Sequence, residues 1–452
     1  FHFKPDHSLL EYQRKLDEYG KPEPSIYEYF KQQPSVCPSL YASYYTEPSK
    51  DLFVSKCDAM RRLLPSVNFR SRWIGTKPVS REPTIGIVTS HLSSYCSVTF
   101  TSLWKARFLN CTVYGIDENT MDDIQYKRLS GHFHSDVTFL ESEELDVIIY
   151  PALHLNIYID ILAMCRLAPV QLTTWGHSDT SGMDSIDYYY TSDYFEEDDC
   201  QKYYSESVIK DTSLSVYYYN LTVPIEKVTS NTDYIICAAT PYKWNDSFIS
   251  AIKKIQNRVG VKLVIIDYAK MPTMDNILNK LKSNLIDFEI VPQLSLSKFM
   301  SYIENSLFVL DTWPFGNCNI TFQTLSRGKC ILTYPSSRLY GKFTQGLYNK
   351  MGFTDLIAHS WDEYIEKAVD MITTPELRHE YENNISINSH KIFNDTQTLT
   401  NFKKIIYNIS SIPSIIHFVY GLKQVEEMCF IHFMAVWSAI YHNKPEQLYF
   451  WY

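Results

Sequence analysis

The sequence lacks the short motifs that mark several large enzyme classes. Its 452 residues contain no G-x-x-x-x-G-K-[ST], no G-x-S-x-G, no H-E-x-x-H and no G-x-G-x-x-G. A phosphate-binding P-loop, a serine-hydrolase nucleophile turn, a helical zinc-protease site and a dinucleotide fingerprint are therefore not indicated. His132 and His134 lie two residues apart without a clear third ligand, so we expect no metal site there.

Signals for export and for membrane insertion are also missing. The chain opens at FHFKPDHS, without the basic and apolar regions of a secretory signal. Its most apolar late stretch, from Cys429 to Tyr441, is too short to cross a bilayer. The ten cysteines are dispersed and include no C-x-x-C pair, which is the pattern of free thiols in a reducing compartment. We expect no membrane span and a cytoplasmic location.

The charge balance argues against nucleic acid as a partner. The net charge is −9, and the Lys and Arg residues are scattered rather than gathered on one segment. Hydrophobic residues make up 45% and charged residues 21%, so long disordered regions are not expected. A chain of this length and composition predicts two or three globular domains, each with its own core.

The first half of the chain predicts a helical lead-in followed by an α/β domain. Residues 1–80 read as short helices broken by prolines, with helical periodicity from Lys50 to Leu64. From residue 81 to 225, short apolar runs alternate with helical stretches, which is typical of a parallel sheet with both faces covered. The expected strands are 84–90, 111–116, 145–151, 170–175 and 187–192, and the expected helices are 97–109 and 157–167.

A second alternation of the same kind spans residues 226–410, with helices expected at 246–259, 274–281, 296–305 and 399–409. The predicted fold class is therefore α/β with two Rossmann-like lobes, whose ligands should bind in the cleft at the carboxyl ends of the strands. Residues 411–452 begin a further α/β unit. The absence of a starting Met and the abrupt end suggest a segment cut from a longer polypeptide.

Polar residues follow a predicted strand of the first lobe in the run from Arg166 to Tyr188. Gly176 and Gly182 let the backbone approach a ligand closely, and His177 and Asp179 offer titratable side chains. A satisfied polar turn explains this segment equally well. His91 follows the first strand and is a further candidate acid or base, although a single histidine is more often structural.

Two segments of the second lobe could hold an anion. In the run from Leu310 to Leu325, a strand leads through Asn317 into a helix that begins near Asn319, where free N–H groups favour a diphosphate. A capped helix without a ligand is the plain alternative. Lys243, three residues after Thr240 at another strand end, could neutralise a phosphate, although an exposed surface lysine is the simpler interpretation.

At these segments the sequence resembles glycosyltransferase family 41, which includes O-linked N-acetylglucosamine transferases and bacterial N-glucosyltransferases. The run from Arg166 to Tyr188 is similar to the family's R-x-A-P-[IV]-Q block with its G-[HY]-P and D-Y elements. The run from Leu310 to Leu325 is similar to its L-D-T-x-P block, and Thr240-Pro-Tyr-Lys243 is similar to its strand-end lysine motif. The correspondence covers roughly residues 50–405 in the same order.

The resemblance implies a fold of the GT-B type and an inverting transfer, without a metal ion or other cofactor, from a UDP-sugar to a protein or peptide side chain. It implies that Lys243 neutralises the β-phosphate and that Thr240 contacts the nucleotide. It also implies that Asn317, Asn319, Ile320 and Thr321 surround the diphosphate and that Gln323 lies at the ribose. The catalytic base stays open among His91, His177 and Asp179.

Three departures from the family pattern leave other functions open. Tyr95 stands where the family usually has a histidine, Gln323 replaces an acidic residue, and Ser178 replaces a proline. A degenerate binding scaffold, or a transferase acting on glycans or small acceptors, is therefore an alternative. The run from Ile412 to Gly421 resembles the opening of a family 32-type sugar transferase, which implies a fused second transferase downstream.

Overall fold

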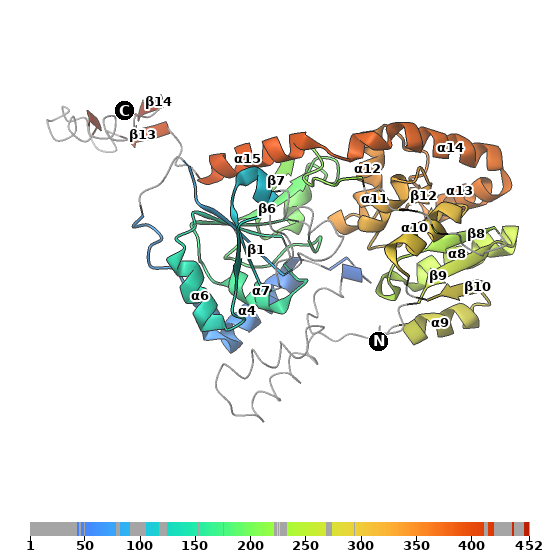
Figure 1. Ribbon diagram of the computed structural model, residues 1–452, viewed down its shortest axis with the longest axis horizontal. Coiled ribbons are helices and arrows are strands. Elements are labelled where there is room, and N and C mark those ends of the chain that lie inside the picture. Colours follow the sequence, from blue (N-terminus) through green and yellow to red (C-terminus); the bar gives the residue numbers. More distant parts are fainter. Residues whose placement is uncertain are drawn as a thin grey trace, which may run out of the picture.

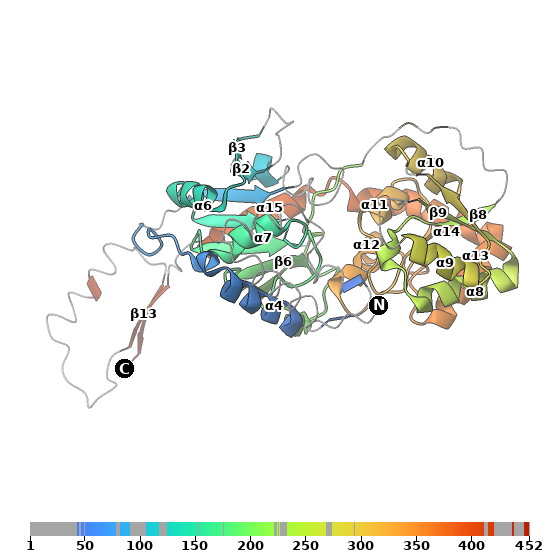
Figure 2. The same ribbon diagram turned by 90° about the horizontal axis from the view of Figure 1, so that it is seen from below.

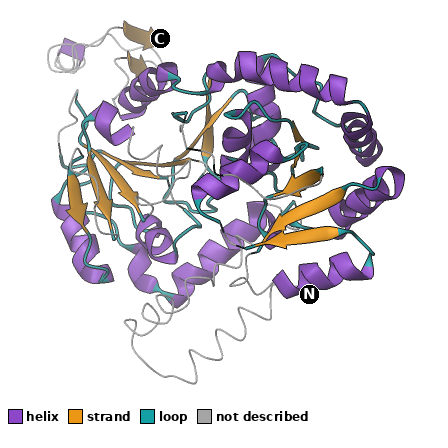
Figure 3. Ribbon diagram, turned by 45° about the vertical axis from the view of Figure 1, so that its right-hand side comes forward, coloured by secondary structure: helices purple, strands orange, loops and turns teal. Residues whose placement is uncertain are grey.

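The computed structural model describes residues 43–44, 47–48, 50–77, 82–90, 105–116, 124–151, 153–174, 176–220, 224, 226, 233–267, 274–292, 294–410, 415–419, 436–437 and 447–451. Over these residues the chain forms two large parallel sheets with helices packed around them (Figure 3). The two sheets belong to two lobes that lie side by side along the long axis of the molecule (Figure 1). The predicted α/β fold with two Rossmann-like sheets is confirmed.

The first sheet has seven parallel strands in the order β3-β2-β1-β4-β5-β6-β7. The strand order reverses between β1 and β4, which are both fully buried and consist of apolar runs. The two edge strands β3 and β7 were not expected from the sequence, because their half-exposed residues form no continuous apolar run. The strands are β1 Ile85–Thr89, β2 Thr112–Gly115, β3 Tyr126–Arg128, β4 Val147–Tyr150, β5 Val170–Thr174, β6 Tyr188–Ser192 and β7 Ser207–Asp211.

Three helices of the first lobe pack against this sheet: α4 (Lys50–Leu63), α6 (Phe133–Ser142) and α7 (Ile157–Met164). The α7 helix is buried along its whole length, and the side chain of Asn156 caps its first turn by accepting hydrogen bonds from the backbone N–H groups of Tyr158 and Ile159. The helix predicted near residues 50–64 is confirmed as α4, which runs along the lower side of the first lobe in Figure 2.

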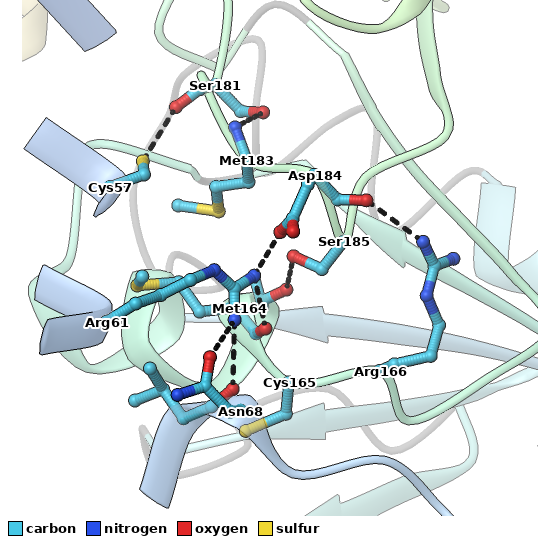
Figure 4. Close-up of polar contacts among 12 residues, drawn as sticks. Cys57, Arg61, Asn68, Met164, Cys165, Arg166, Ser181, Met183, Asp184 and Ser185 are labelled. Carbon is cyan, nitrogen blue, oxygen red and sulfur yellow. Dashed lines mark hydrogen bonds and ion pairs between the residues drawn. The ribbon is translucent and has the colours of Figure 1, made fainter. Parts of the chain in front are cut away.

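Arg61 joins α4 to the first lobe (Figure 4). Its guanidinium donates to the carbonyl oxygen of Met164 at 3.0 Å and forms an ion pair with Asp184. One turn earlier, the Cys57 thiol donates to the carbonyl oxygen of Ser181 at 3.5 Å. Because Met164, Ser181 and Asp184 all belong to the first lobe, this part of the lead-in packs as one of the helices of that lobe.

The second sheet has five parallel strands in the order β10-β9-β8-β11-β12, and its order reverses between β8 and β11. The helices predicted at 246–259 and 296–305 are confirmed at both ends as α8 and α10. The strands are β8 Tyr234–Cys237, β9 Lys262–Ile266, β10 Phe288–Val291, β11 Val309–Leu310 and β12 Ile331–Leu332. The helices are α8 Asp246–Val259, α9 Met274–Ser283, α10 Leu296–Asn305, α11 Asn319–Leu325, α12 Phe343–Met351, α13 Trp361–Thr373 and α14 Pro375–Asn388.

The α15 helix (Thr396–Ser410) carries the chain from the second lobe back to the first (Figure 1). Phe402 packs on Tyr190 of β6, with ring centroids 4.8 Å apart. The buried ammonium of Lys105 lies over both rings, 3.8 Å from the Phe402 centroid and 4.5 Å from the Tyr190 centroid. Burial lowers the pKa of Lys105 to about 7. The closing helix therefore covers the first sheet and connects the two lobes.

The lobes also touch directly through α12. The α-carbon of Gly346 lies so close to the first lobe that a Cβ atom there would be 2.5 Å from the carbonyl oxygen of Tyr194 and 2.3 Å from the ring of Phe195. Beside it, the ammonium of Lys342 forms an ion pair with Glu197 at 2.6 Å. Glycine at position 346 thus permits a contact between the lobes that a larger residue would prevent.

The last part of the chain forms a small separate sheet. Strand β13 (Ile415–Val419) pairs in parallel with β14 (Gln447–Trp451), as expected for the start of another α/β unit. The rest of the run from Ile412 to Gly421, on which the second resemblance depends, lies outside the described residues. No helix within the described ranges is both long enough and apolar enough to cross a membrane.

Candidate functional site

The candidate site lies where the strand order of the second sheet reverses. In parallel α/β sheets, ligands bind outside the carboxyl ends of the strands at this reversal. Strand β8 ends at Cys237 and leads to Lys243, while the neighbouring β11 ends at Leu310 and leads into the turn of residues 311–318. The topology therefore brings together two of the segments that the sequence singled out.

Lys243 bridges these two segments. Its ammonium donates a hydrogen bond to the carbonyl oxygen of Gly316 at 2.7 Å and lies 4.6 Å from the centre of the Phe315 ring. Burial lowers the pKa of Lys243 to about 8, while the charge of Asp311 opposes this shift. The lysine is half-buried and points into the 311–318 turn, so the interpretation as a fully exposed surface lysine is wrong.

Asp311 organises the turn that holds Lys243. Its buried carboxylate accepts hydrogen bonds from the hydroxyl groups of Thr333 at 2.9 Å and Thr344 at 2.7 Å, and from the backbone N–H of Asn317 at 2.6 Å. Burial nevertheless raises the pKa of this carboxyl group. The close packing at Gly316, where a Cβ atom would lie 3.2 Å from the Asp311 carboxylate, keeps the turn tight.

Asn317 has an unusual side chain in this turn. It is 1% exposed, and neither the oxygen nor the nitrogen of its amide has a hydrogen-bond partner among the described residues. A buried unpaired amide costs about 1 to 3 kcal/mol, so such a group commonly marks a place for a bound ligand or water. The following helix is α11. Its first intrahelical hydrogen bond runs from the Phe322 N–H to the Cys318 carbonyl oxygen at 3.1 Å, so the N–H groups of Ile320 and Thr321 lie N-terminal to this bond.

The other predicted residues of the second lobe occupy different surroundings. Thr240 is half-exposed and precedes the short turn that carries Lys243. Asn319 and Ile320 are half-buried in the first turn of α11, whereas the hydroxyl of Thr321 is buried and lies 2.9 Å from that of Thr344. Gln323 lines a separate small cavity with Tyr218, Phe322 and Phe393.

In the first lobe, the loop of residues 177–183 follows β5, and buried polar side chains fix its position. Glu206 accepts hydrogen bonds from the Thr180 hydroxyl at 2.6 Å and from the Ser181 backbone N–H at 2.7 Å. At its base, the amide of Gln171 accepts from the Leu167 N–H at 2.6 Å and donates to the Cys165 and Ser185 carbonyls. These contacts hold the loop in one shape against the lobe.

Arg166 shows that part of the family-like block is structural. Its guanidinium forms an ion pair with Asp187 at 2.6 Å and donates to the Asp184 carbonyl at 3.1 Å (Figure 4). Arg166, Gln171 and Asp187 therefore shape the loop from below rather than facing the cleft. The residues left to face the second lobe are His177 and Asp179.

His177 meets the second lobe through Phe315. The two rings stack with centroids 5.7 Å apart and planes 17° apart, and Phe315 stacks on Tyr340 from its other side at 4.9 Å. Burial lowers the pKa of His177 well below its usual value, and the positive charges of His154, Lys56 and Lys243 act in the same direction. The ring is therefore neutral at pH 7, and its Nε2 has no hydrogen-bond partner within the described ranges.

Asp179 is buried beside His177 and faces the lead-in. Its carboxylate accepts a hydrogen bond from the Ser43 hydroxyl at 2.7 Å and another from the Thr180 backbone N–H at 2.9 Å. Burial raises the pKa of Asp179 to about 6, against the opposing effect of these hydrogen bonds. At pH 7 it is an ionised carboxylate in contact with a hydroxyl group, which is the arrangement that a general base requires.

We expect the Asp179→Asn substitution to stabilise the protein more at pH 7 than at pH 4. The raised pKa means that the folded state binds more protons than the unfolded state between about pH 3.8 and 6. The contribution of Asp179 to stability is therefore present below this window and is lost as the pH rises through 6. Urea unfolding at both pH values should show a difference of about 2 kcal/mol. The same comparison for the exposed residue Asp275, replaced by asparagine, should show no such change. Equal effects of Asp179→Asn at both pH values would contradict the raised pKa of Asp179.

His154, at the end of β4, was not singled out from the sequence. Its Nε2 lies 3.1 Å from the Thr180 carbonyl oxygen, and its Nδ1 lies 3.5 Å from the Asp160 carboxylate. The ring is perpendicular to that of His177, with centroids 5.8 Å apart. Its contacts with Thr180 and His177 come from the loop that follows β5, far along the chain, so no local pattern around this histidine could have revealed them.

The structure thus brings together Lys243, Asn317, His177 and Asp179, with the Phe315 ring between the two lobes. Gln323 lies against another cavity. His91 and Tyr95 lie outside the described residues, so the roles considered for them remain predictions. Ser178, which replaces a proline of the family pattern, is buried in the loop that follows β5.

Comparisons with known proteins agree with this picture. The chain is 24% identical over 254 residues to the UDP-glucose:protein N-beta-glucosyltransferase of Actinobacillus pleuropneumoniae serotype 5b (strain L20), and equally so to that of serotype 7 (strain AP76). Each match covers 53% of this chain and 40% of the relative. The chain therefore spans well under half the length of these curated relatives. No family model matches the sequence.

The solved structures give the fold. An O-GlcNAc transferase variant of Thermobaculum terrenum superposes with a TM-score of 0.72 at 14% identity, covering 84% of this chain and 79% of that one. A UDP-forming α,α-trehalose-phosphate synthase of Burkholderia xenovorans gives 0.50 at 9% identity, covering 73% of this chain and 100% of that one. The fold is of the GT-B type, and the resemblance to glycosyltransferase family 41 is confirmed.

Proposed function

We propose that this family 41-like chain is an inverting glycosyltransferase that transfers a hexose or N-acetylhexosamine from a UDP-sugar to a protein side chain. The observation that carries the proposal is the position of Lys243. A half-buried lysine lies at the strand-order reversal of the second sheet and contacts the 311–318 turn at Gly316. The names of the sequence relatives, which are UDP-glucose:protein N-beta-glucosyltransferases, support the same donor and acceptor classes.

In this proposal the second lobe holds the nucleotide. Lys243 would neutralise charge that develops on the β-phosphate as the sugar leaves, which is the electrostatic help that a diphosphate leaving group needs. The unpaired amide of Asn317 would supply a hydrogen bond to the same group, and the N–H groups of Asn319, Ile320 and Thr321 are close to it in the chain. Thr240 would contact the nucleotide, while Gln323 would reach the ribose only if its side chain turns away from its present cavity.

The first lobe would supply the base. In a single displacement, the acceptor atom attacks the anomeric carbon, the bond from that carbon to the phosphate oxygen breaks, and UDP leaves with the electron pair. The proton of the acceptor must pass to a base on the attacking side. Asp179 fits this role better than His177, because it is ionised at pH 7 and already accepts a hydrogen bond from a hydroxyl group. Burial holds the pKa of His177 well below its usual value, which makes its ring a weaker base.

The described cysteines form no disulfide, which is consistent with a cytoplasmic enzyme. Seven of the ten cysteines fall in the described ranges, and none of these seven is joined to another. We propose that the protein acts in the cytoplasm.

The experiment that tests the donor site is calorimetry with UDP, UDP-glucose and UDP-N-acetylglucosamine. Binding of at least one of them supports the proposal and identifies the sugar. If none binds, the degenerate scaffold becomes the better interpretation of the fold.

The affinity for UDP should also depend on pH through Lys243. The pKa of this lysine in the free protein is about 8, so its positive charge is present below that pH and is lost above it. We expect UDP binding to weaken as the pH rises from 7.5 to 9.5, by a factor of roughly ten if the charge contributes about 1.4 kcal/mol. Calorimetry at both pH values measures this. A Lys243→Ala variant should lose this dependence, and an unchanged affinity in the wild type would count against the charge role.

A further inference from the structure

Four residues of the lead-in run through the candidate site. They are Ser43, Tyr44, Glu47 and Pro48, which we call the strap. They precede α4, which is attached to the first lobe, and they contact both lobes around the residues proposed for donor and acceptor. A part of the chain itself therefore lies where a substrate would bind.

The first contact of the strap is with the proposed base. The hydroxyl of Ser43 donates to the Asp179 carboxylate at 2.7 Å, and Ser43 is completely buried. A hydroxyl group on a polypeptide, in hydrogen-bond contact with a carboxylate, is the arrangement expected of an acceptor serine beside its general base.

Tyr44 fills the space between the lobes. Its ring lies edge-on to Phe315 with centroids 4.6 Å apart, stacks on Tyr242 at 6.2 Å and meets His177 edge-on at 6.3 Å. Tyr242 and Phe315 belong to the second lobe and His177 to the first. Aromatic pairs of this kind are each worth about 0.5 to 1.5 kcal/mol beyond the area that they bury, so Tyr44 is well held.

The remaining strap residues, Glu47 and Pro48, contact the second lobe through one side chain and one backbone carbonyl group. The backbone N–H of Ser337 donates to the Glu47 carboxylate at 2.8 Å, and the Arg338 guanidinium donates to the Pro48 carbonyl oxygen at 2.8 Å. Arg338 also stacks on Tyr203, with its guanidinium carbon 3.7 Å from the ring centre. The Ser337 contact binds an acidic side chain, and the Arg338 contact to Pro48 binds a backbone carbonyl group. Both kinds of contact are common in peptide recognition.

The attachment of α4 keeps the strap close to this groove. Phe53 is completely buried, and its ring lies 5.7 Å from that of His154, while Arg61 and Cys57 bond to the first lobe a few residues further on. A tethered segment of this kind reaches an effective concentration of about millimolar. A free peptide must compete with it for the same contacts.

We propose that the strap occupies the groove that binds the acceptor polypeptide and imitates an acceptor there. The inference rests on the proposed function and deepens it. The acceptor would carry a hydroxyl-bearing residue at the position of Ser43, an aromatic residue directly after it and an acidic residue four positions after it, like Glu47. The acceptor hydroxyl would replace that of Ser43 on Asp179, and the strap would leave the groove when a protein substrate binds.

The test uses a fluorescein-labelled peptide with the sequence of residues 40–50, LYASYYTEPSK, and full-length protein. Its binding is followed by fluorescence anisotropy in the wild type and in a Tyr44→Ala/Glu47→Gln double variant. Loss of the contacts of Tyr44 and Glu47 releases the strap, so we expect the peptide to bind the double variant at least tenfold more tightly than the wild type. A control protein, Asp51→Asn on the exposed side of α4, should bind the peptide as the wild type does.

A second peptide tests the chemistry of recognition. Alanine in place of the serine that corresponds to Ser43, together with glutamine in place of the glutamate that corresponds to Glu47, should weaken binding to the double variant at least tenfold. Equal binding of the two peptides, or peptide binding to the double variant that is no tighter than to the wild type, would overturn the inference. UDP calorimetry on the same samples is independent of the peptide. If the wild type does not bind UDP, the proposed function is wrong, whereas the result with the peptides is unaffected.

If the double variant fails to fold, hydrogen exchange on the wild type tests the inference instead. Adding the unlabelled peptide at millimolar concentration should increase amide exchange at Tyr44 and Glu47, because the bound peptide displaces them. Unchanged exchange at both residues, at a concentration where the labelled peptide is bound, would overturn the inference.

Discussion

Replacing Lys243 by alanine is expected to weaken the binding of UDP by about 2 to 3 kcal/mol, a factor of roughly thirty to a hundred and fifty. The reason is the position of the ammonium group, which lies 2.7 Å from the Gly316 carbonyl oxygen in a turn where Asn317 has an unpaired buried amide. A charged hydrogen bond to a phosphate in such surroundings contributes more than one at the surface. Calorimetric titration with UDP measures the loss directly.

The matched control is Lys254→Ala, which removes an exposed lysine from α8 in the same lobe. The net charge then changes equally, so any general electrostatic attraction of UDP is reduced to the same extent. We expect the control to alter the affinity less than twofold. A similar loss in both variants would show that UDP responds to the overall charge and would remove the main support for the site.

The second large effect is expected from Gly182→Ala, which should destabilise the protein by about 3 kcal/mol. Gly182 has a φ of +71°, and a Cβ atom there would lie 2.4 Å from the carbonyl carbon of Phe53 and 2.6 Å from its carbonyl oxygen. Phe53 is in α4, whose backbone cannot move away without breaking the contacts of Arg61 and Cys57. The substitution therefore combines backbone strain with a clash.

Gly260→Ala separates the two causes. Gly260 ends α8 with a φ of +66°, and a Cβ atom there would meet no other atom of the described residues within 4 Å. It should cost only the backbone strain, about 1 kcal/mol. Urea unfolding of both variants gives the comparison. If Gly182→Ala is no more destabilising than Gly260→Ala, then α4 is not packed against the 177–183 loop as the structure has it.

Much of the fold could be predicted because buried parallel strands and amphipathic helices leave clear local patterns. The apolar run at Ile85–Thr89 is a central strand, and α8 and α10 begin and end at the predicted residues. In the structure, the side chains of Asn245 and Ser295 cap their first turns. The edge strands β3 and β7 escaped prediction because half-exposed strands of three to five residues carry little apolar pattern.

The site was predicted only in part, because its geometry depends on contacts between distant residues. The expectation that ligands bind at the carboxyl ends of strands pointed to Lys243, Asn317, His177 and Asp179, and their roles stay predictions. It could not show that Phe315 joins the two lobes, that His154 lies behind His177, or that Ser43 contacts Asp179 across 136 residues of sequence. Gln323 was expected at the ribose from the resemblance alone, and its side chain now faces another cavity.

The activity that we propose for this chain is the transfer of a sugar from a UDP donor to a polypeptide. The most direct measurement is the intact mass of serine-, threonine- and asparagine-containing peptides after incubation with the protein and each UDP-sugar. We expect the addition of one hexose or N-acetylhexosamine to at least one peptide, together with release of UDP, and we expect both to be lost in Lys243→Ala. Binding of UDP without any transfer or donor hydrolysis, even at high protein concentration, would contradict this proposal and identify the chain as a binding scaffold.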